Sequence, residues 1–140
     1  MDDFGITELT DGECWELLRG EEFGRLAFHL ADEVHIAPVN YAVDSRTLLI
    51  RTAEGSKLLG VVMNPDIAFE IDGIQGDVAR SVILRGRARR LEEHEAWRAE
   101  AVPLRPWVSN LKYDVVEIVP TQVTGRAFAL SRPWRRERVD

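Results

Sequence analysis

The chain has 140 residues, the size of one ordinary domain, and 45% of them are hydrophobic, which is enough for a buried core. Its net charge of -6 argues against general nucleic-acid binding, because neutralising phosphates needs a basic surface. No apolar run approaches the roughly 20 residues that cross a bilayer, and the single cysteine, Cys14, excludes an internal disulfide and a cysteine-based zinc cluster.

The first third of the chain predicts a short helix and then three strands. Thr10 and Glu13 have the spacing of a capping box, and Gly20 is a good helix stop, so we expect a helix over 11–19. Alternating apolar and polar residues, separated by short polar breaks, then predict an antiparallel meander. Its three strands are 23–30, 34–43 and 47–51. Pro38 cannot donate to a ladder, so we expect the second strand to be bulged or locally open there, or to carry an ordinary edge bulge.

The remaining two thirds continue with strands and short helices. In chain order we expect a helix over 56–63, a strand over 66–72, a loop over 73–78, a long strand over 80–91, a charged helix over 92–102, and strands over 113–119 and 124–130. Six or seven antiparallel strands in so short a chain favour a closed barrel, because closure removes exposed edges. We expect one domain over 1–140, with a core over about 10–130 and a polar tail over 131–140. The acidic N-terminus is unlike a secretory signal, so we expect a cytoplasmic location.

The usual enzyme motifs are absent from the sequence. It contains no nucleophile elbow, no zinc-protease helix motif, no dinucleotide-binding glycine loop and no P-loop. His29 and His35 fall on adjacent predicted strands, but two histidines without a carboxylate cluster make a poor metal site. We therefore predict no metal, and the catalytic residues stay unknown.

The stretch RTAEGSKL, residues 51–58, is the best candidate for a binding site. It links a predicted strand to a predicted helix, and the free amides of a first helical turn stabilise anions. Ser56 can cap that helix, and Lys57 adds a charge where the helix dipole alone disfavours a cation. Arg51 and Thr52 can add a guanidinium and a hydroxyl from the end of the strand. A phosphate site and a plain solvated turn both remain open on these residues alone.

Several short motifs occur in an order typical of one family. They are Gly-Arg-Leu-Ala at 24–27, Pro-Val-Asn-Tyr at 38–41, the 51–58 link, Asn-Pro at 64–65, Phe-Glu-Ile-Asp at 69–72, the 81–88 strand, Pro-Trp at 106–107 and Thr-Gly-Arg at 124–126. On these motifs the chain resembles the pyridoxamine 5'-phosphate oxidase-like family of flavin-binding split β-barrels, over about residues 10–130.

This resemblance implies a mainly β fold with short helices, a six- or seven-stranded antiparallel split β-barrel, and an obligate-type homodimer. Flavin mononucleotide (FMN) would lie between the two subunits. The resemblance implies that Arg51, Thr52, Ser56 and Lys57 hold its phosphate, and that Pro38, Val39, Asn40 and Tyr41 line its ring, largely through the backbone. Trp107 would approach the cofactor, with a core or interface anchor as the equal alternative.

The C-terminal residues do not match those that hold the substrate in true pyridoxamine phosphate oxidases, so we do not expect a vitamin B6 oxidase. The resemblance implies an FMN-dependent reductase or oxidase of a small organic substrate. The alternatives are a 5-deazaflavin-dependent reductase on the same fold, a non-catalytic flavin carrier or sensor, and a scaffold with a degenerate site. The sequence does not name the substrate, whose pocket we expect to involve 73–78 and 103–110.

Overall fold

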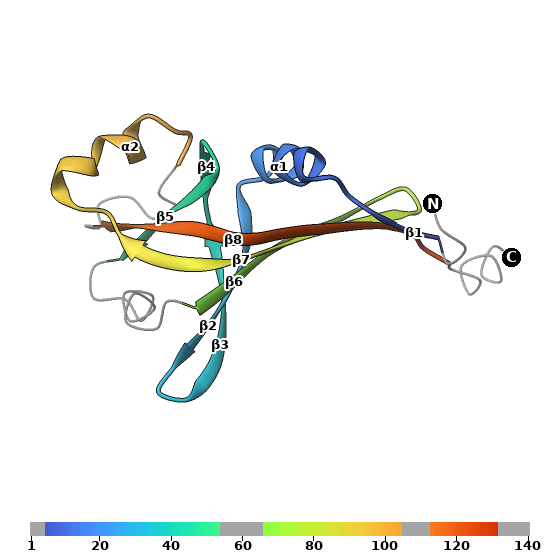
Figure 1. Cartoon of the computed structure of the whole chain (residues 1–140), viewed down its shortest axis with the longest axis horizontal. Helices are drawn as coiled ribbons and strands as arrows, with labels where there is room; N and C mark the ends of the chain where they lie inside the picture. The colour runs from blue at the N-terminus through green and yellow to red at the C-terminus, as the bar shows by residue number, and fades with distance from the viewer. Residues whose placement is uncertain (1–4, 54–65, 105–112, 132–140) are drawn as a thin grey trace, which may run out of the picture.

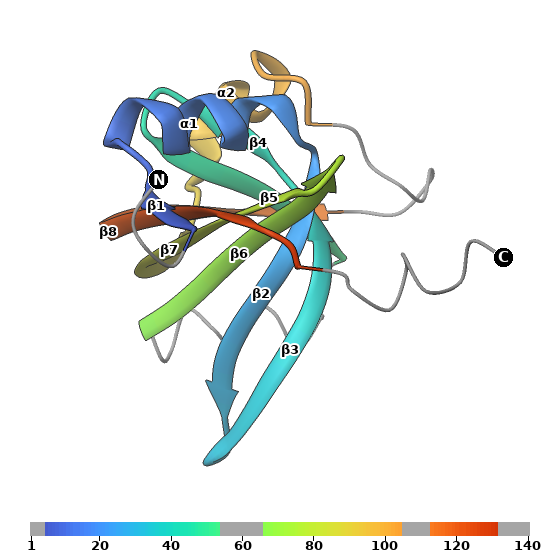
Figure 2. The same ribbon diagram turned by 90° about the vertical axis from the view of Figure 1, so that its right-hand side faces the viewer.

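The computed structural model describes residues 5–53, 66–104 and 113–131. Within these ranges one antiparallel sheet dominates the molecule (Figures 1 and 2). Its elements are β1 Ile6–Glu8, α1 Asp11–Gly20, β2 Phe23–Leu30, β3 Glu33–Asn40, β4 Ala42–Asp44, β5 Thr47–Ala53, β6 Asp66–Gln75, β7 Val78–Arg90, the 3-10 turn η2 Glu93–Glu95, α2 Trp97–Glu100 and β8 Tyr113–Ala129. The predicted helix over 56–63 lies outside the described residues.

The sheet is a curled half-barrel, which confirms the mainly β split-barrel prediction, although the described residues form eight strands and not the expected six or seven. The strand order is β3-β2-β6-β7-β8-β5-β4, with β1 beside β8. β3 and β4 stand at opposite ends of this order, yet only Tyr41 separates them along the chain. One segment of chain therefore supplies both ends of the sheet, which draws the sheet into the curl seen in Figure 2.

Three predicted elements have other boundaries in the structure, the first two because strand pairing decided them and local composition did not. Residues 73–75 extend β6, and the hairpin turns at Gly76, whose φ of 62° suits glycine. The predicted strands 113–119 and 124–130 form one strand, β8, because β7 pairs along its length and a bulge absorbs the extra residue. The predicted helix 92–102 is reduced to η2 and the single turn of α2.

The expected bulge at Pro38 is also wrong. β2 and β3 pair without a register shift from Phe23↔Asn40 to Leu30↔Glu33, and Pro38 lies opposite Arg25. β3 is an end strand of the sheet, where a residue without a backbone N–H is tolerated. The edge position therefore accommodates Pro38 without any interruption of the β2–β3 pairing.

Two apolar clusters lie on the two faces of β5 and β8. The larger cluster contains Leu48 and Ile50 with the buried residues of α1, including the free cysteine Cys14. The smaller cluster contains Leu49 together with Ala99 of α2. α1 begins with the predicted capping box, in which the Thr10 hydroxyl accepts a hydrogen bond from the backbone N–H of Glu13. In the described part of the chain, no helix has the length and apolarity that crossing a membrane requires.

Candidate functional site

Arg51 and Thr52 lie near the end of β5, where β5 pairs with the start of β8. Successive side chains of a strand point to opposite faces of the sheet. Thr52 shares its face with Leu48 and Ile50 of the larger cluster, whereas Arg51 shares its face with Leu49 and α2. The two residues are thus adjacent in the backbone, but their side chains leave the sheet on different faces.

Three buried side-chain atoms among the described residues lack a hydrogen-bond partner, and all three lie at this strand end. They are Arg51 Nε, Thr52 Oγ1 and Asp114 Oδ2. Unpaired buried polar atoms are rare in folded proteins and are costly to the apo protein. Their concentration at one place marks the end of β5 as a site suited to a polar ligand.

The Arg51 guanidinium is only partly used within the chain. Its side chain is 17% exposed, and Nη2 donates to Oε1 of Glu100, on α2, at 3.1 Å. The Nε–H, in contrast, has no acceptor in residues 5–53, 66–104 and 113–131. A guanidinium N–H is a donor only, so the group that completes this side of the site must be an acceptor, and a phosphate oxygen fits that requirement.

Asp114 is a site residue that the sequence did not reveal. It lies directly opposite Thr52 in the β5–β8 register, so the two side chains share a face. Its Oδ1 contacts Nη2 of Arg90 at 2.5 Å, while Oδ2 is buried and unpaired. No sequence motif marks Asp114 as a site residue, since it stands in an ordinary strand pattern. Its position opposite Thr52 in the sheet is what places it in the site.

The residues predicted to line a flavin ring divide between core and surface. Pro38 is exposed and Asn40 is half-buried, whereas Val39 and Tyr41 are buried. The Tyr41 hydroxyl donates to the Leu18 carbonyl at 2.6 Å, and burial raises the pKa of Tyr41 well above its usual value. The Tyr41 side chain is therefore committed to the core. A groove of about 580 Å³ is lined by Tyr41 together with Arg19, Val43 and Pro103.

Ser56, Lys57 and Trp107, predicted to complete the site, lie outside the described residues. Of the predicted substrate loops, 73–78 is a β-hairpin, and only the first part of 103–110 is described. The described part of the candidate site therefore comprises the end of β5, the start of β8 and the β3–β4 junction.

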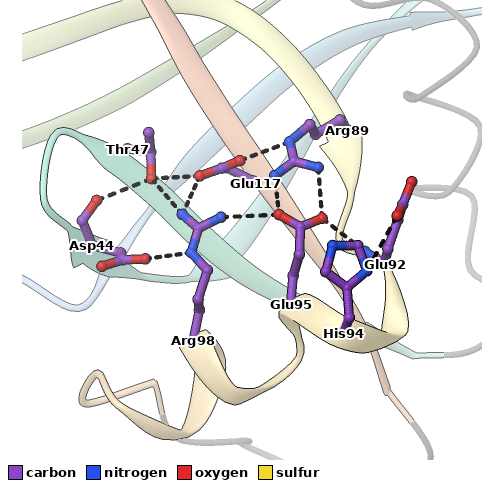
Figure 3. Close-up of polar contacts among 8 residues, drawn as sticks. All are labelled: Asp44, Thr47, Arg89, Glu92, His94, Glu95, Arg98 and Glu117. Carbon is purple, nitrogen blue, oxygen red and sulfur yellow. Dashed lines mark hydrogen bonds and ion pairs between the residues drawn. The ribbon is translucent and has the colours of Figure 1, made fainter.

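A second polar cluster holds α2 against the sheet (Figure 3). At its centre the buried carboxylate of Glu117 accepts hydrogen bonds from Arg89 Nε at 2.8 Å, from Thr47 Oγ1 at 2.9 Å and from Arg98. Burial acts to raise the Glu117 pKa, but the hydrogen bonds of Arg98, Thr47 and Arg89 prevail and lower it. The Arg98 Nε also donates to Asp44 at 2.8 Å. Because these groups satisfy one another, we assign this cluster a structural role.

The carboxylates of Glu92 and Glu95 and the ring of His94 offer ligand atoms that lie within 4.8 Å of one another. Both oxygens of Glu95 are engaged by Arg89, at 2.8 and 2.5 Å. This pairing with Arg89 lowers the pKa of Glu95 to about 2. The Glu95 carboxylate therefore serves an ion pair with Arg89, and the other two groups are exposed on the surface.

The sequence pattern of the family described as pyridoxamine 5'-phosphate oxidase matches residues 10–127. The chain belongs to this family. The chain is similar to a provisionally named pyridoxamine 5'-phosphate oxidase from Corynebacterium glutamicum, whose crystal structure is known. The two sequences are 36% identical, and the match covers 94% of this chain and 99% of the other, with a TM-score of 0.81.

Two mycobacterial relatives are also similar to the chain. The structure of the FAD binding protein from Mycobacterium smegmatis is 39% identical, with a TM-score of 0.80, and covers 89% of this chain and all of the other. The uncharacterised protein Rv3129 of Mycobacterium tuberculosis is 41% identical over 87 residues, which are 61% of this chain and 79% of the relative.

Proposed function

We propose that the chain is a flavin-dependent oxidoreductase that binds FMN at the end of β5. The observation that carries this proposal is the buried Nε–H of Arg51, a donor at the predicted phosphate position that finds no acceptor among the described residues. Family membership and the FAD-binding relative from M. smegmatis support a flavin as the ligand. FAD contains the same riboflavin phosphate, so a site of this kind suits either nucleotide.

In this proposal the protein binds and orients the cofactor and excludes water from it. Arg51, Ser56 and Lys57 take the phosphate, with Thr52 at the same strand end, and the backbone of 38–41 borders the ring beside Trp107. When bound, the flavin supplies the electron or hydride transfer chemistry. We expect the substrate of the chain to be a small organic molecule.

Spectroscopy of the purified protein and titration with cofactors test the proposal. We expect flavin absorbance in the purified protein, or quenching of flavin fluorescence when FMN is added, with one flavin per chain at saturation. FAD and a 5-deazaflavin coenzyme are titrated in parallel. Selective binding of the deazaflavin would show that the cofactor is a 5-deazaflavin coenzyme and not FMN. Failure to bind any of the three would refute the proposal. Turnover of reduced nicotinamide with an added electron acceptor distinguishes an enzyme from a carrier.

Lys57→Ala should weaken FMN binding by about tenfold or more, because a charge-assisted contact to the phosphate is lost. Riboflavin lacks that phosphate, so its affinity should stay within about twofold of wild type in this variant. The affinities are measured by fluorescence titration of the two ligands. Lys112→Ala changes the only other lysine of the chain and is the matched control. Equal FMN affinity in Lys57→Ala and wild type would remove Lys57 from the site.

We further propose that two copies of the chain form a homodimer through the outer face of β2, β3 and β7. Val34 and Ile36 alternate along β3 on this face and are 71% and 70% exposed. Phe23 on β2 and Ile83 on β7 add exposed apolar surface to the same face. The β2–β3 hairpin that carries Val34 and Ile36 projects from the body of the sheet (Figures 1 and 2). Exposed apolar surface gathered in this way is typical of protein interfaces.

Ile36→Glu should convert the dimer into a monomer, because a dimer would bury the new carboxylate without a partner. Light scattering coupled to size exclusion measures the mass directly. Trp97→Glu places the same charge at a similarly exposed apolar residue on α2 and should leave the dimer intact. A dimer that survives Ile36→Glu and dissociates with Trp97→Glu would move the interface to α2.

A further inference from the structure

The strand pair β5–β8 holds a carboxylate oxygen that has no donor within the described part of the chain. Asp114 is 11% exposed at its side chain, and Arg90 fixes its Oδ1 at 2.5 Å. Its Oδ2 is buried, and none of the described residues donates to it. The ion pair therefore orients the carboxylate and leaves one oxygen available on the face that Asp114 shares with Thr52.

The chemistry of this oxygen limits what it can bind. An ionised carboxylate oxygen is an acceptor only, so it requires an O–H or N–H from its partner. The Thr52 hydroxyl on the same face is also unpaired, and a hydroxyl both donates and accepts. A ligand hydroxyl can meet both requirements at once, because it can donate to Asp114 and accept from Thr52.

The neighbouring residue, Arg51, indicates a second group that the ligand must carry. Arg51 precedes Thr52 directly in β5, and its unpaired Nε–H requires an acceptor. Arg51 and Thr52 are consecutive residues at the last described part of β5, and we take one ligand to contact both. The ligand must then carry an anionic or acceptor group close to a hydroxyl group, as in a polyol phosphate.

We propose that Asp114 is a ligand-binding residue that, together with Thr52, takes a hydroxyl of the polyol chain next to the phosphate, with Arg90 as its positioning residue. This inference rests on the proposed function, since the ribityl phosphate of FMN is such a polyol phosphate. It separates Asp114 and Thr52, which contact the polyol, from Arg51, which contacts the phosphate.

Titration of Asp114→Asn with FMN and with riboflavin tests the inference. The variant keeps the shape of the side chain, but with its amide oxygen held by Arg90 it places a donor NH2 where the acceptor Oδ2 was. Both ligands contain the polyol, so their affinities should fall by the same factor, on the order of tenfold. Lys57→Ala, in contrast, should affect FMN alone. Thr52→Val should likewise weaken both ligands, and it removes an unpaired buried hydroxyl, so the melting temperature of its apo form should be equal to or above that of wild type.

Asp32→Asn makes the same change in charge at the tip of the β2–β3 turn and should bind both ligands as wild type does. The inference fails if Asp114→Asn and Thr52→Val bind both flavins within about twofold of wild type, or if they weaken FMN alone. A melting temperature of apo Asp114→Asn far below wild type, with Thr52→Val binding normally, would assign Asp114 a structural role instead. If wild type binds neither flavin, the proposed function fails and this inference fails with it.

Discussion

Glu117→Ala should lower the free energy of unfolding by about 3–5 kcal/mol, the cost of removing one partner from a buried ion pair. Glu117 is 4% exposed, and its carboxylate joins Arg89, Arg98 and Thr47 between β8 and α2. Without it, the Arg98 guanidinium, whose side chain is 18% exposed, keeps its positive charge and loses its most buried partner. Chemical denaturation of the variant and of wild type at neutral pH measures the difference.

Glu93→Ala is the matched control, because Glu93 is an exposed carboxylate on the adjoining turn η2. It should change the stability by no more than about 0.5 kcal/mol. The contribution of Glu117 also has a defined pH dependence. Its pKa is lowered in the folded chain from 4.5, so the contribution is complete above that value and is lost as pH falls through the folded pKa. The gap between wild type and Glu117→Ala should therefore narrow below about pH 4.5, and a constant gap would contradict the ion-pair account.

The Glu117 cluster also connects the fold to the candidate site. The same short helix, α2, carries Arg98, which binds Glu117, and Glu100, which contacts Arg51. Loss of the cluster would release α2 and with it the carboxylate that holds one nitrogen of Arg51. The cluster is thus structural in its contacts, and it orients a residue of the proposed phosphate site.

Local sequence patterns predicted the helices and strands correctly where interactions between residues close in sequence determine them. The capping box at Thr10 and Glu13 placed α1 within one residue of its observed end, and alternation placed β2 correctly. Prediction failed where distant pairing decides the structure. The strand β8 continues through Pro120, which on its own signals a break, because β7 pairs with β8 on both sides of it.

In the candidate site, too, residues marked by a local pattern could be predicted, and residues brought together by distant strand pairing could not. Arg51 and Thr52 could be singled out because a strand, a glycine and a cationic turn adjoin along the chain. Asp114 could not, because its importance comes from its position opposite Thr52 and from Arg90, both distant in sequence. Likewise, Thr47 and Glu117 are separated by 70 residues, and no local signal joins them.

Gly86→Ala should destabilise the fold by about 1–3 kcal/mol, because the new methyl group would meet backbone that cannot move freely. A Cβ at Gly86 would lie 2.3 Å from the carbonyl oxygen of Val119 and 2.9 Å from Cα of Pro120. This is the bulge between β7 and β8, where the register shifts between Arg85 and Gly86. Denaturation of the variant and wild type under the same conditions gives the difference.

Gly73→Ala is the matched control for this prediction. Gly73 stands in the neighbouring strand β6, and a Cβ built there meets nothing within 4 Å. Alanine should be neutral or stabilise by up to about 1 kcal/mol there, since it restricts the unfolded chain without a clash. Bulges bend a strand and increase its twist, so the two long strands β7 and β8 owe part of their curvature to this point. If Gly86→Ala is as stable as Gly73→Ala, the bulge yields to a methyl group, and the curl of the sheet must depend on other contacts.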